Sequence, residues 1–197
     1  MASSRGRALL AFAIGFVVFG GFDSLYTWAG GQSYSARLAP VSVHGWPVYV
    51  PFQMGLAALV VLAGWSRLSR VLPEALRREP LTTSSPWRAI GASLAPLVFG
   101  LALAFVLLDH PTHGSAFVAL TMLSVLALAI GARRIELVAF ALVGIAGPAA
   151  EWALLDPRLD YWRFVHTELF ERLPAWEPFV YGWVGVTIHR ISERPDA

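Results

Sequence analysis

The 197-residue chain contains no cysteine and no lysine, and only 14% of its residues are charged. Without cysteine there are no disulfides, thiolate nucleophiles or zinc–thiolate sites. Without lysine there is no Schiff-base chemistry on a lysine amine. A soluble domain carries about a quarter charged residues. A chain that is 56% hydrophobic, with a mean hydropathy of +0.59, is therefore predicted to be an integral membrane protein.

The basic residues do not point to nucleic acid. The net charge is only +2, and most arginines lie between the apolar segments, where membrane topology places them. The sequence contains neither a glycine-rich phosphate loop nor a G-x-S-x-G elbow. We therefore expect no nucleic-acid partner, no cofactor and no ATP-driven transport by this chain alone.

Six apolar segments are long enough to cross a membrane. A hydrocarbon core about 30 Å thick needs about 20 mostly apolar residues per helix. The sequence thus predicts an all-α, polytopic bundle of about six transmembrane helices in a single membrane domain, residues 1–197. The sixth segment is the weakest, because charged residues flank it closely. The segments are Ala8–Ala29, Pro47–Trp65, Ala89–Leu108, Ser115–Ala132, Ile135–Leu155 and Pro174–Ile191.

The arginines predict the orientation. If the N-terminus is cytoplasmic, eleven of the fifteen basic residues fall in inner segments. The other four, Arg37, Arg158, Arg163 and Arg172, fall in outer segments. By the positive-inside rule, both termini are expected in the cytoplasm, with the chain crossing the inner (plasma) membrane several times.

A short internal repeat relates the second and sixth segments. Both open as P-x-aromatic-x-P-F-x-x-G, over residues 47–55 and 174–182. An acid lies upstream of each: Asp23 is 24 residues before Pro47, and Glu151 is 23 residues before Pro174. The pattern predicts two repeat-like halves, 8–65 and 135–191, in parallel orientation. The alternative is a helix-start signature without function, since proline is favoured in a first turn.

Three acids near the predicted outer face are candidate catalytic residues: Asp23, Glu151 and Glu177. An acid inside a membrane span is unfavourable and suggests a function by default. Apolar surroundings favour the neutral carboxyl group, the form that general-acid catalysis needs. Glu177 stands where the first half of the repeat has Val50, as an addition for a specialised site would. The alternative is that each acid lies at the interface or pairs with an outer-side arginine.

Aromatic and histidine side chains gather on the same predicted side. The aromatic residues are also explained by an interfacial belt. His110 and His113, in a loop with Asp109, are weak metal-ligand candidates, so no metal site is predicted. The candidate substrate-binding residues are His44, Trp46, Tyr49, Trp152, Trp162, Trp176 and Tyr181.

Two stretches resemble a known family. Gly31–Pro40 with Gly45–Pro51 follows the first acid, and Glu151–Trp162 continues to Leu173-Pro174 and Tyr181-Gly182-Trp183. These pieces resemble the membrane carotenoid hydratases that act on bacterioruberin-type precursors. The chain departs from that pattern at Trp46 and Glu177. The resemblance implies an isoprenoid or carotenoid substrate.

Together these features predict an intramembrane enzyme that protonates an alkene of an isoprenoid lipid near the outer face. Glu151 or Asp23 would deliver the proton, and aromatic faces would stabilise the carbocation. Capture by water would give hydration, and capture by a neighbouring alkene would give cyclisation. Asp160 or Glu177 would orient the water or remove the last proton.

The alternative is a non-enzymatic membrane protein, either a small-solute carrier or a lipid- or pigment-binding subunit of a complex. The sequence predicts no oligomeric state. The depth of the acids distinguishes these hypotheses. Acids that line a closed apolar cavity favour an enzyme, whereas a polar path to both faces favours a carrier.

Overall fold

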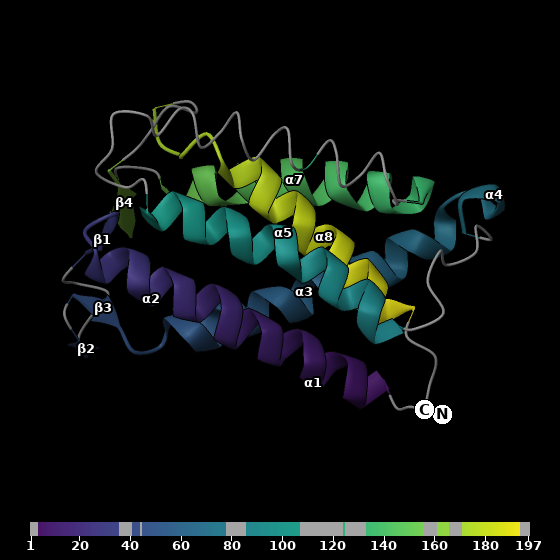
Figure 1. The fold of residues 1–197 in the computed structure, drawn as a ribbon, viewed down its shortest axis with the longest axis horizontal. Helices are drawn as coiled ribbons and strands as arrows, with labels where there is room; N and C mark the ends of the chain where they lie inside the picture. Colours follow the sequence, from purple (N-terminus) through teal and green to yellow (C-terminus); the bar gives the residue numbers. More distant parts are fainter. Residues whose placement is uncertain are drawn as a thin grey trace.

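The computed structural model describes residues 4–35, 41–43, 45–77, 86–106, 124, 133–155, 161–165 and 171–193. Within these ranges, three helices are long and apolar enough to cross a membrane, namely Arg5–Trp28, Val50–Val71 and Arg134–Leu154. The helices pack side by side as a bundle (Figure 1). The predicted all-α, polytopic membrane architecture is confirmed.

The first membrane helix is continuous but contains a π-helical turn. Helix α1 (Ser4–Ile14) passes into the π turn η1 (Gly15–Phe19) and then into α2 (Gly20–Trp28). A π turn adds one residue to a helical turn and is frequent at functional positions. The extra residue rotates the face of α2, one turn before Asp23, relative to that of α1.

Helix α3 (Val50–Val71) begins three residues later and ends six residues later than the predicted span Pro47–Trp65. Pro51 lies in its first turn, where the missing N–H has no helical partner to lose. Trp46–Pro47 instead forms strand β3, which pairs with β2 (Ser42–Val43). Its far end carries Arg67 and Arg70, which are exposed, and long side chains of this kind place their charges in water beyond the apolar part of a membrane helix.

The remaining predicted spans agree with helices wherever the structure describes them. Ala89–Leu108, Ile135–Leu155 and Pro174–Ile191 correspond within three residues at each end to α5 (Pro86–Val106), α7 (Arg134–Leu154) and α8 (Glu177–Ser192). The predicted span Ser115–Ala132 lies outside the described residues, apart from Ser124. The short helix α4 (Glu74–Arg77) follows α3 and corresponds to no predicted span.

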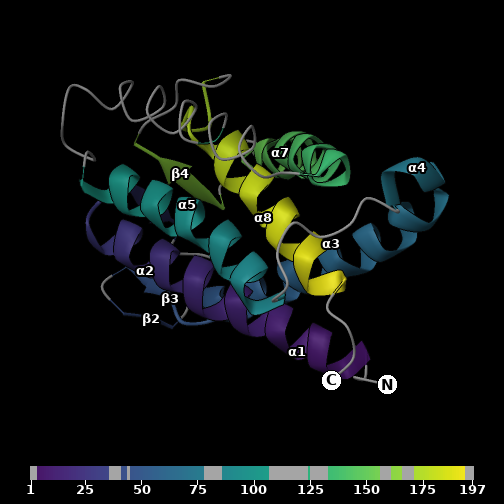
Figure 2. The same cartoon turned by 45° about the vertical axis from the view of Figure 1, so that its right-hand side comes forward.

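Helix α8, the segment that looked weakest in the sequence, lies at the centre of the bundle. It contacts α1, α3, α5 and α7 (Figure 2), and every residue from Gly182 to His189 is buried. Polar side chains on a helix buried all round need partners inside the protein. Thr187 Oγ1, for example, lies 2.8 Å from the carbonyl oxygen of Trp183 and 3.0 Å from Ser93 Oγ. Such pairing explains how a helix with polar residues occupies the core.

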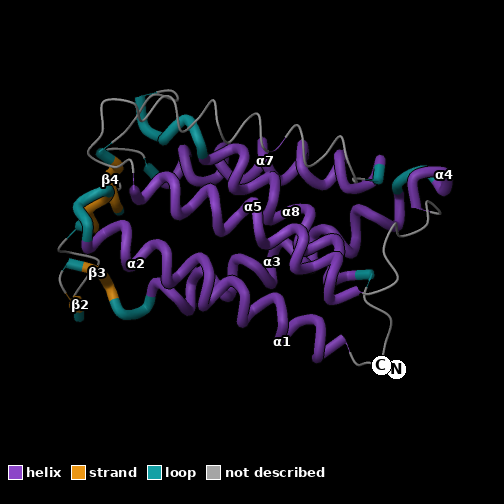
Figure 3. Tube along the Cα trace, viewed as in Figure 1, coloured by secondary structure: helices purple, strands orange, loops and turns teal. Residues whose placement is uncertain are grey.

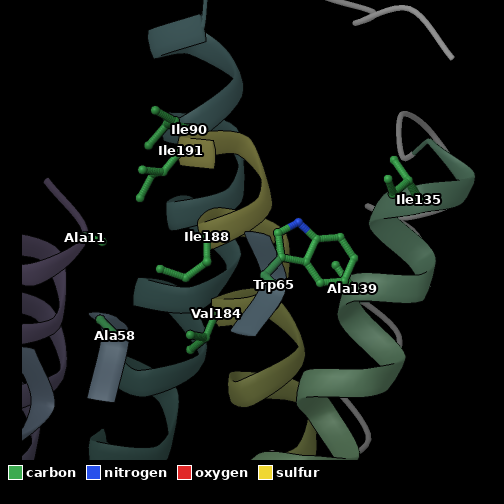
Figure 4. Close-up of a cluster of buried hydrophobic side chains, with 9 residues drawn as sticks. All are labelled: Ala11, Ala58, Trp65, Ile90, Ile135, Ala139, Val184, Ile188 and Ile191. Atoms are coloured by element: carbon green, nitrogen blue, oxygen red, sulfur yellow. The ribbon is translucent and has the colours of Figure 1, made fainter. Parts of the chain in front are cut away.

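A cluster of buried apolar side chains joins four of the helices around α8 (Figure 4). Small residues on α1, α3 and α7 allow close approach, while branched residues of α8 fill the space between them. Trp65 of α3 is the one aromatic residue of this described cluster. The cluster consists of Ala11, Ala58, Trp65, Ile90, Ile135, Ala139, Val184, Ile188 and Ile191.

The bundle has two distinct ends (Figure 3). At one end, which we call the strand end, β1 (Gln32–Tyr34) pairs antiparallel with β4 (Trp162–Phe164). At the other, here the terminal end, α1 begins and α8 ends, and Arg7 Nη1 donates a hydrogen bond of 2.8 Å to the carbonyl oxygen of Ser192. The strands β1 and β4 thus connect the loops that follow the first and fifth predicted spans.

Two contacts recur at positions that the sequence repeat pairs. A Cβ on Gly55 would lie 2.6 Å from the Phe12 ring, and a Cβ on Gly182 would lie 2.6 Å from the Phe140 ring. Each phenylalanine precedes the acid of its half by eleven residues, Asp23 and Glu151 respectively. In both halves, glycine is needed because the ring of the preceding helix occupies the space of a side chain. The duplication itself stays a prediction.

Candidate functional site

A cavity of about 110 Å³ lies inside the bundle toward the strand end. Helices α2, α3, α5, α7 and α8, together with β1 and β4, contribute its wall. Most of the wall is apolar, and the described part of the lining contains three carboxyl groups but neither arginine nor histidine. The lining residues are Phe19, Phe22, Asp23, Gln32, Met54, Ala57, Ala58, Val61, Leu101, Glu151, Phe164, Trp176, Glu177, Val180, Tyr181 and Val184.

Asp23 is fixed by donors from the first loop. Gln32 Nε2 donates to Oδ1 at 2.5 Å, and the Tyr34 hydroxyl donates to Oδ2 at 2.7 Å. Gln32 Nε2 also lies 3.0 Å from Thr27 Oγ1. Both carboxyl oxygens therefore accept a hydrogen bond, which holds the side chain in one orientation. Asp23 is 8% exposed, so these bonds also replace lost water.

Glu151 is held in a corresponding way. The indole N–H of Trp162 donates to Oε1 at 3.2 Å, and the Tyr181 hydroxyl donates to Oε2 at 2.6 Å. Trp162 follows Glu151 by eleven residues, the same spacing that separates Asp23 from its donor Tyr34. In both cases the helix places the acid and the following strand returns an aromatic donor to it.

Glu177 and Trp176 differ from the other polar residues of the cavity. Both are 3% exposed and line the cavity. Glu177 Oε2 and Trp176 Nε1 have no hydrogen-bond partner among the described residues. Most buried polar atoms in proteins are paired. The site therefore contains one carboxyl oxygen and one N–H that have no hydrogen-bond partner among the described residues.

Burial raises the pKa of the Tyr34 phenol, and the neighbouring Asp23 raises it further. The neutral phenol, which donates to Asp23, is thus favoured in the folded protein. Because the folded pKa is above the unfolded value of about 10, this contribution to stability is complete below that pH and is lost as the pH rises beyond it.

We therefore expect the unfolding free energy to fall less steeply above pH 10 in a Tyr34→Phe variant than in the wild type. At neutral pH the variant should lose about 1 kcal/mol, the worth of one hydrogen bond. Chemical unfolding in detergent at several pH values measures both effects. An identical pH dependence for the two proteins would contradict the assigned role of Tyr34.

The structure brings together some of the residues predicted from the sequence and separates others. One cavity is lined by five of them, namely Asp23, Glu151, Glu177, Trp176 and Tyr181. Trp162 does not line it but donates a hydrogen bond to Glu151, which does. Trp152 is 40% exposed and packs against Arg172, whose Cζ lies 4.4 Å from the ring centroid. Trp46 and Tyr49 are half-buried and do not line the cavity. The remaining predicted residues, His44, His110, His113 and Asp160, lie outside the described residues.

A second polar cluster, at the terminal end, was not predicted. Arg190 Nε donates to Glu136 Oε1 at 2.8 Å, and the backbone N–H of Arg133 donates to Glu136 Oε2 at 2.9 Å. The side chains of Arg133 and Glu136 are 4% and 2% exposed. The sequence signal was present as polar residues on the last turns of an otherwise apolar helix. We name this the ionic cluster; it contains Arg133, Glu136, His189, Arg190 and Glu193.

His189 joins the ionic cluster to the apolar core. The Trp65 indole N–H donates to His189 Nδ1 at 3.0 Å, so that nitrogen carries no proton. The opposite nitrogen, Nε2, lies 2.8 Å from Arg133 Nη2 and 3.4 Å from Glu193 Oε2. Among the described residues, no group of three or more histidine, aspartate or glutamate side chains is placed to hold a metal ion.

Comparison with known proteins shows the fold. No protein-family model matches the chain, and no curated protein matches it. A cross-linked trimer of the protein MvINS is similar, with a TM-score of 0.70 at 19% identity over 98% of this chain and 97% of that one. MvINS itself, a mycobacterial Insig homologue from Mycobacterium vanbaalenii, gives a TM-score of 0.65 at 22% identity and the same coverage. At these identities the likeness concerns the fold alone, and it extends over nearly the whole of both chains.

Proposed function

We propose that this protein binds a lipid within the membrane, with an apolar chain in the central cavity and a hydroxyl-bearing head group at its three carboxyl groups. The observation that carries the proposal is the pair of unpartnered atoms, Glu177 Oε2 and Trp176 Nε1. They belong to neighbouring residues, and both side chains line the cavity. The proposal has two parts, the head group and the chain.

The unpaired atoms of Trp176 and Glu177 indicate what kind of head group the site binds. A buried polar group without a partner costs about 1–3 kcal/mol. The Trp176 N–H needs an acceptor, and Glu177 Oε2 accepts or donates according to its protonation. A hydroxyl group satisfies both kinds of partner, whereas an anionic head group would meet three carboxyl groups and no cation in the described lining. A neutral, hydroxyl-bearing head group fits best.

The wall of the cavity indicates that the ligand also has a hydrocarbon chain. Phe19, Phe22, Met54 and Val180 present hydrocarbon to the space. Hydrocarbon walls of this kind favour an apolar guest over water. Ala57 lines the cavity and is also exposed on the surface of α3. A chain longer than the cavity therefore has a route toward the surrounding lipid along α3.

A carrier fits this arrangement less well. The buried apolar cluster that contains Ala58, Val184 and Ile188 lies between the cavity and the ionic cluster. A polar solute would have to cross this cluster, where the buried hydroxyl groups of Thr187 and Ser93 are already bonded to each other. The central cavity is thus a binding site that a lipid enters from the strand end or from the membrane.

The orientation in the membrane is part of the proposal. The arginine bias of the sequence favours cytoplasmic termini in the plasma membrane. The start of α1 and the end of α8 meet at one end, where Arg7 bonds to Ser192. The head-group site, at the opposite end, would then be near the outer face. The crystallised MvINS trimer suggests the same assembly for this chain.

A specific observation also favours catalysis as a second candidate function. Glu177 presents a free carboxyl oxygen to an apolar cavity lined by aromatic rings. In its neutral form it could transfer a proton to an alkene carbon of an isoprenoid, forming a C–H bond and a carbocation. Water would then add to the cation and return one proton to the Glu177 carboxylate, giving a tertiary alcohol. Asp23 and Glu151 suit this step less well, because donors already occupy both of their oxygens.

An Ala57→Trp variant is expected to exclude the lipid by filling the cavity from its exposed side. Leu56→Trp is the matched control, since Leu56 is its neighbour on α3, is 56% exposed and does not line the cavity. Lipids that co-purify with each protein are extracted and quantified by mass spectrometry. The proposal expects at least tenfold less of one lipid class, about 1.4 kcal/mol of binding, in Ala57→Trp alone. An equal lipid content in all three proteins would refute it.

A further inference from the structure

A second and larger pocket, of about 650 Å³, opens at the terminal end between α1, α3 and α8. Its polar side includes two guanidinium groups, those of Arg7 and Arg70, and two hydroxyl groups, those of Ser66 and Ser69. This pocket is separate from the central cavity, because no residue lines both.

The free charge in this pocket is positive. Arg70 is exposed and has no hydrogen-bond or ion-pair partner among the described residues. Arg7 uses Nη1 for the Ser192 carbonyl oxygen, a neutral partner. Glu193 is the one acid of the described lining, and it is already bound by Arg133 of the ionic cluster. Two guanidinium groups thus have no counter-ion in this part of the chain.

The opposite side of the pocket is hydrocarbon. Leu59, Leu62 and Ala63 of α3 and Ala8 of α1 complete the wall. A guanidinium group binds phosphate oxygens through paired N–H donors, and basic side chains at the end of a membrane helix attract anionic lipid head groups. A small soluble anion would use the arginines but would leave the apolar wall unused.

We propose that this pocket binds an anionic phospholipid, with its phosphate at Arg7 and Arg70 and an acyl chain along Leu59 and Leu62. The Ser66 hydroxyl group donates to a remaining phosphate oxygen, and so does that of Ser69 when it turns from the Ser66 carbonyl oxygen, which lies 3.5 Å away. This site is independent of the proposed function of the central cavity, because it uses a different pocket and a charged rather than a neutral ligand.

The test uses the full-length protein in detergent, titrated with phosphatidylglycerol and, separately, with phosphatidylcholine and inorganic phosphate, while native mass spectrometry counts the adducts. Arg70→Gln is the main variant, since Arg70 has no described partner whose loss would disturb folding. Arg67→Gln is the matched control, because Arg67 is exposed on the same helix and does not line the pocket. Ser69→Asp, which adds a negative charge to the pocket, is the second variant.

We expect phosphatidylglycerol to bind the wild type and Arg67→Gln equally. Its affinity should be about tenfold weaker for Arg70→Gln, as for the loss of one charge-assisted hydrogen bond, and weaker again for Ser69→Asp. Phosphatidylcholine should bind no better to the wild type than to the variants. Equal affinity of wild type and Arg70→Gln for phosphatidylglycerol, or equal binding of the two lipids, would overturn the proposal. Phosphate binding that competes with no lipid would overturn it as well, in favour of a soluble anion.

Discussion

A Glu177→Leu variant is expected to keep its fold and to lose most of its bound lipid. The substitution removes the free oxygen at the head-group site and places hydrocarbon in its position. Oε2 of this side chain has no described hydrogen-bond partner. Removing a buried polar atom that is unpaired should not destabilise the bundle. The ligand, in contrast, loses its partner, and its hydroxyl group would become the unpaired atom. We expect an affinity at least tenfold weaker.

The matched variant Glu177→Gln separates binding from catalysis. Its amide keeps an oxygen acceptor and an N–H donor, so a binding protein should retain its lipid within a few-fold. An enzyme that protonates an alkene should lose turnover, because an amide cannot transfer a proton in this way. Two measurements follow: the lipid content of the purified proteins, and the lipid and pigment profile of a carotenoid-producing host with each variant.

Three outcomes are distinct. Lipid retained in Glu177→Gln, with no new product in any host, supports the binding function. A product heavier by one water, or an isomer of unchanged mass, that disappears in Glu177→Gln supports the enzyme. Full lipid content in Glu177→Leu would contradict both, since the two functions share this head-group site.

A Glu136→Leu variant is expected to lose about 3–5 kcal/mol of folding stability, as when one partner is removed from a buried ion pair. Glu136 accepts hydrogen bonds from Arg190 Nε and from the Arg133 backbone, and its side chain is 2% exposed. Without it, Arg190 retains only the carbonyl oxygen of Ala89 among its described partners. Thermal unfolding in detergent measures the loss.

Glu193→Gln is the control for this prediction. Glu193 also bonds to Arg133, but its side chain is 27% exposed. Water can therefore replace part of what is lost, and the expected destabilisation is about 1 kcal/mol or less. Equal unfolding temperatures for Glu136→Leu and the wild type would show that the ionic cluster is not a structural element of the terminal end.

The sequence predicted the helices well because hydrophobic length is a local property. Pro47 is the informative error. The repeat placed a helix start at this proline, but the chain first pairs Trp46–Pro47 with Ser42–Val43 and turns into α3 only at Val50. Strand pairing depends on partners distant in the sequence, and no periodicity of a two-residue strand reveals it.

The site was predicted in its chemistry rather than its geometry. An acidic side chain within a membrane span is energetically unfavourable and therefore suggests a function, which identified Asp23, Glu151 and Glu177 as candidates. The sequence could not show that Gln32 and Tyr34 donate hydrogen bonds to Asp23. Nor could it show that Trp162 and Tyr181 donate to Glu151, because these donors come from other segments of the chain. That difference changes the proposed proton donor from Glu151 or Asp23 to Glu177, whose Oε2 has no described hydrogen-bond partner.

Helix α8 shows why composition misled at one point. Its charged and polar residues made it the weakest predicted span, since a helix facing lipid needs apolar residues on its surface. In the bundle it faces protein on all sides. Thr187, His189 and Arg190 find partners on α5, α3 and α7 respectively.

The most direct test of the proposed function is an experimental density map of the wild-type protein in lipid nanodiscs that contain lipids extracted from its own host. The proposal expects elongated density in the central cavity, with its polar end within hydrogen-bond distance of Glu177 Oε2 and Trp176 Nε1, and its chain leaving beside Ala57. A cavity collapsed onto its own side chains, or occupied only by water joined to the three carboxyl groups, would contradict the account.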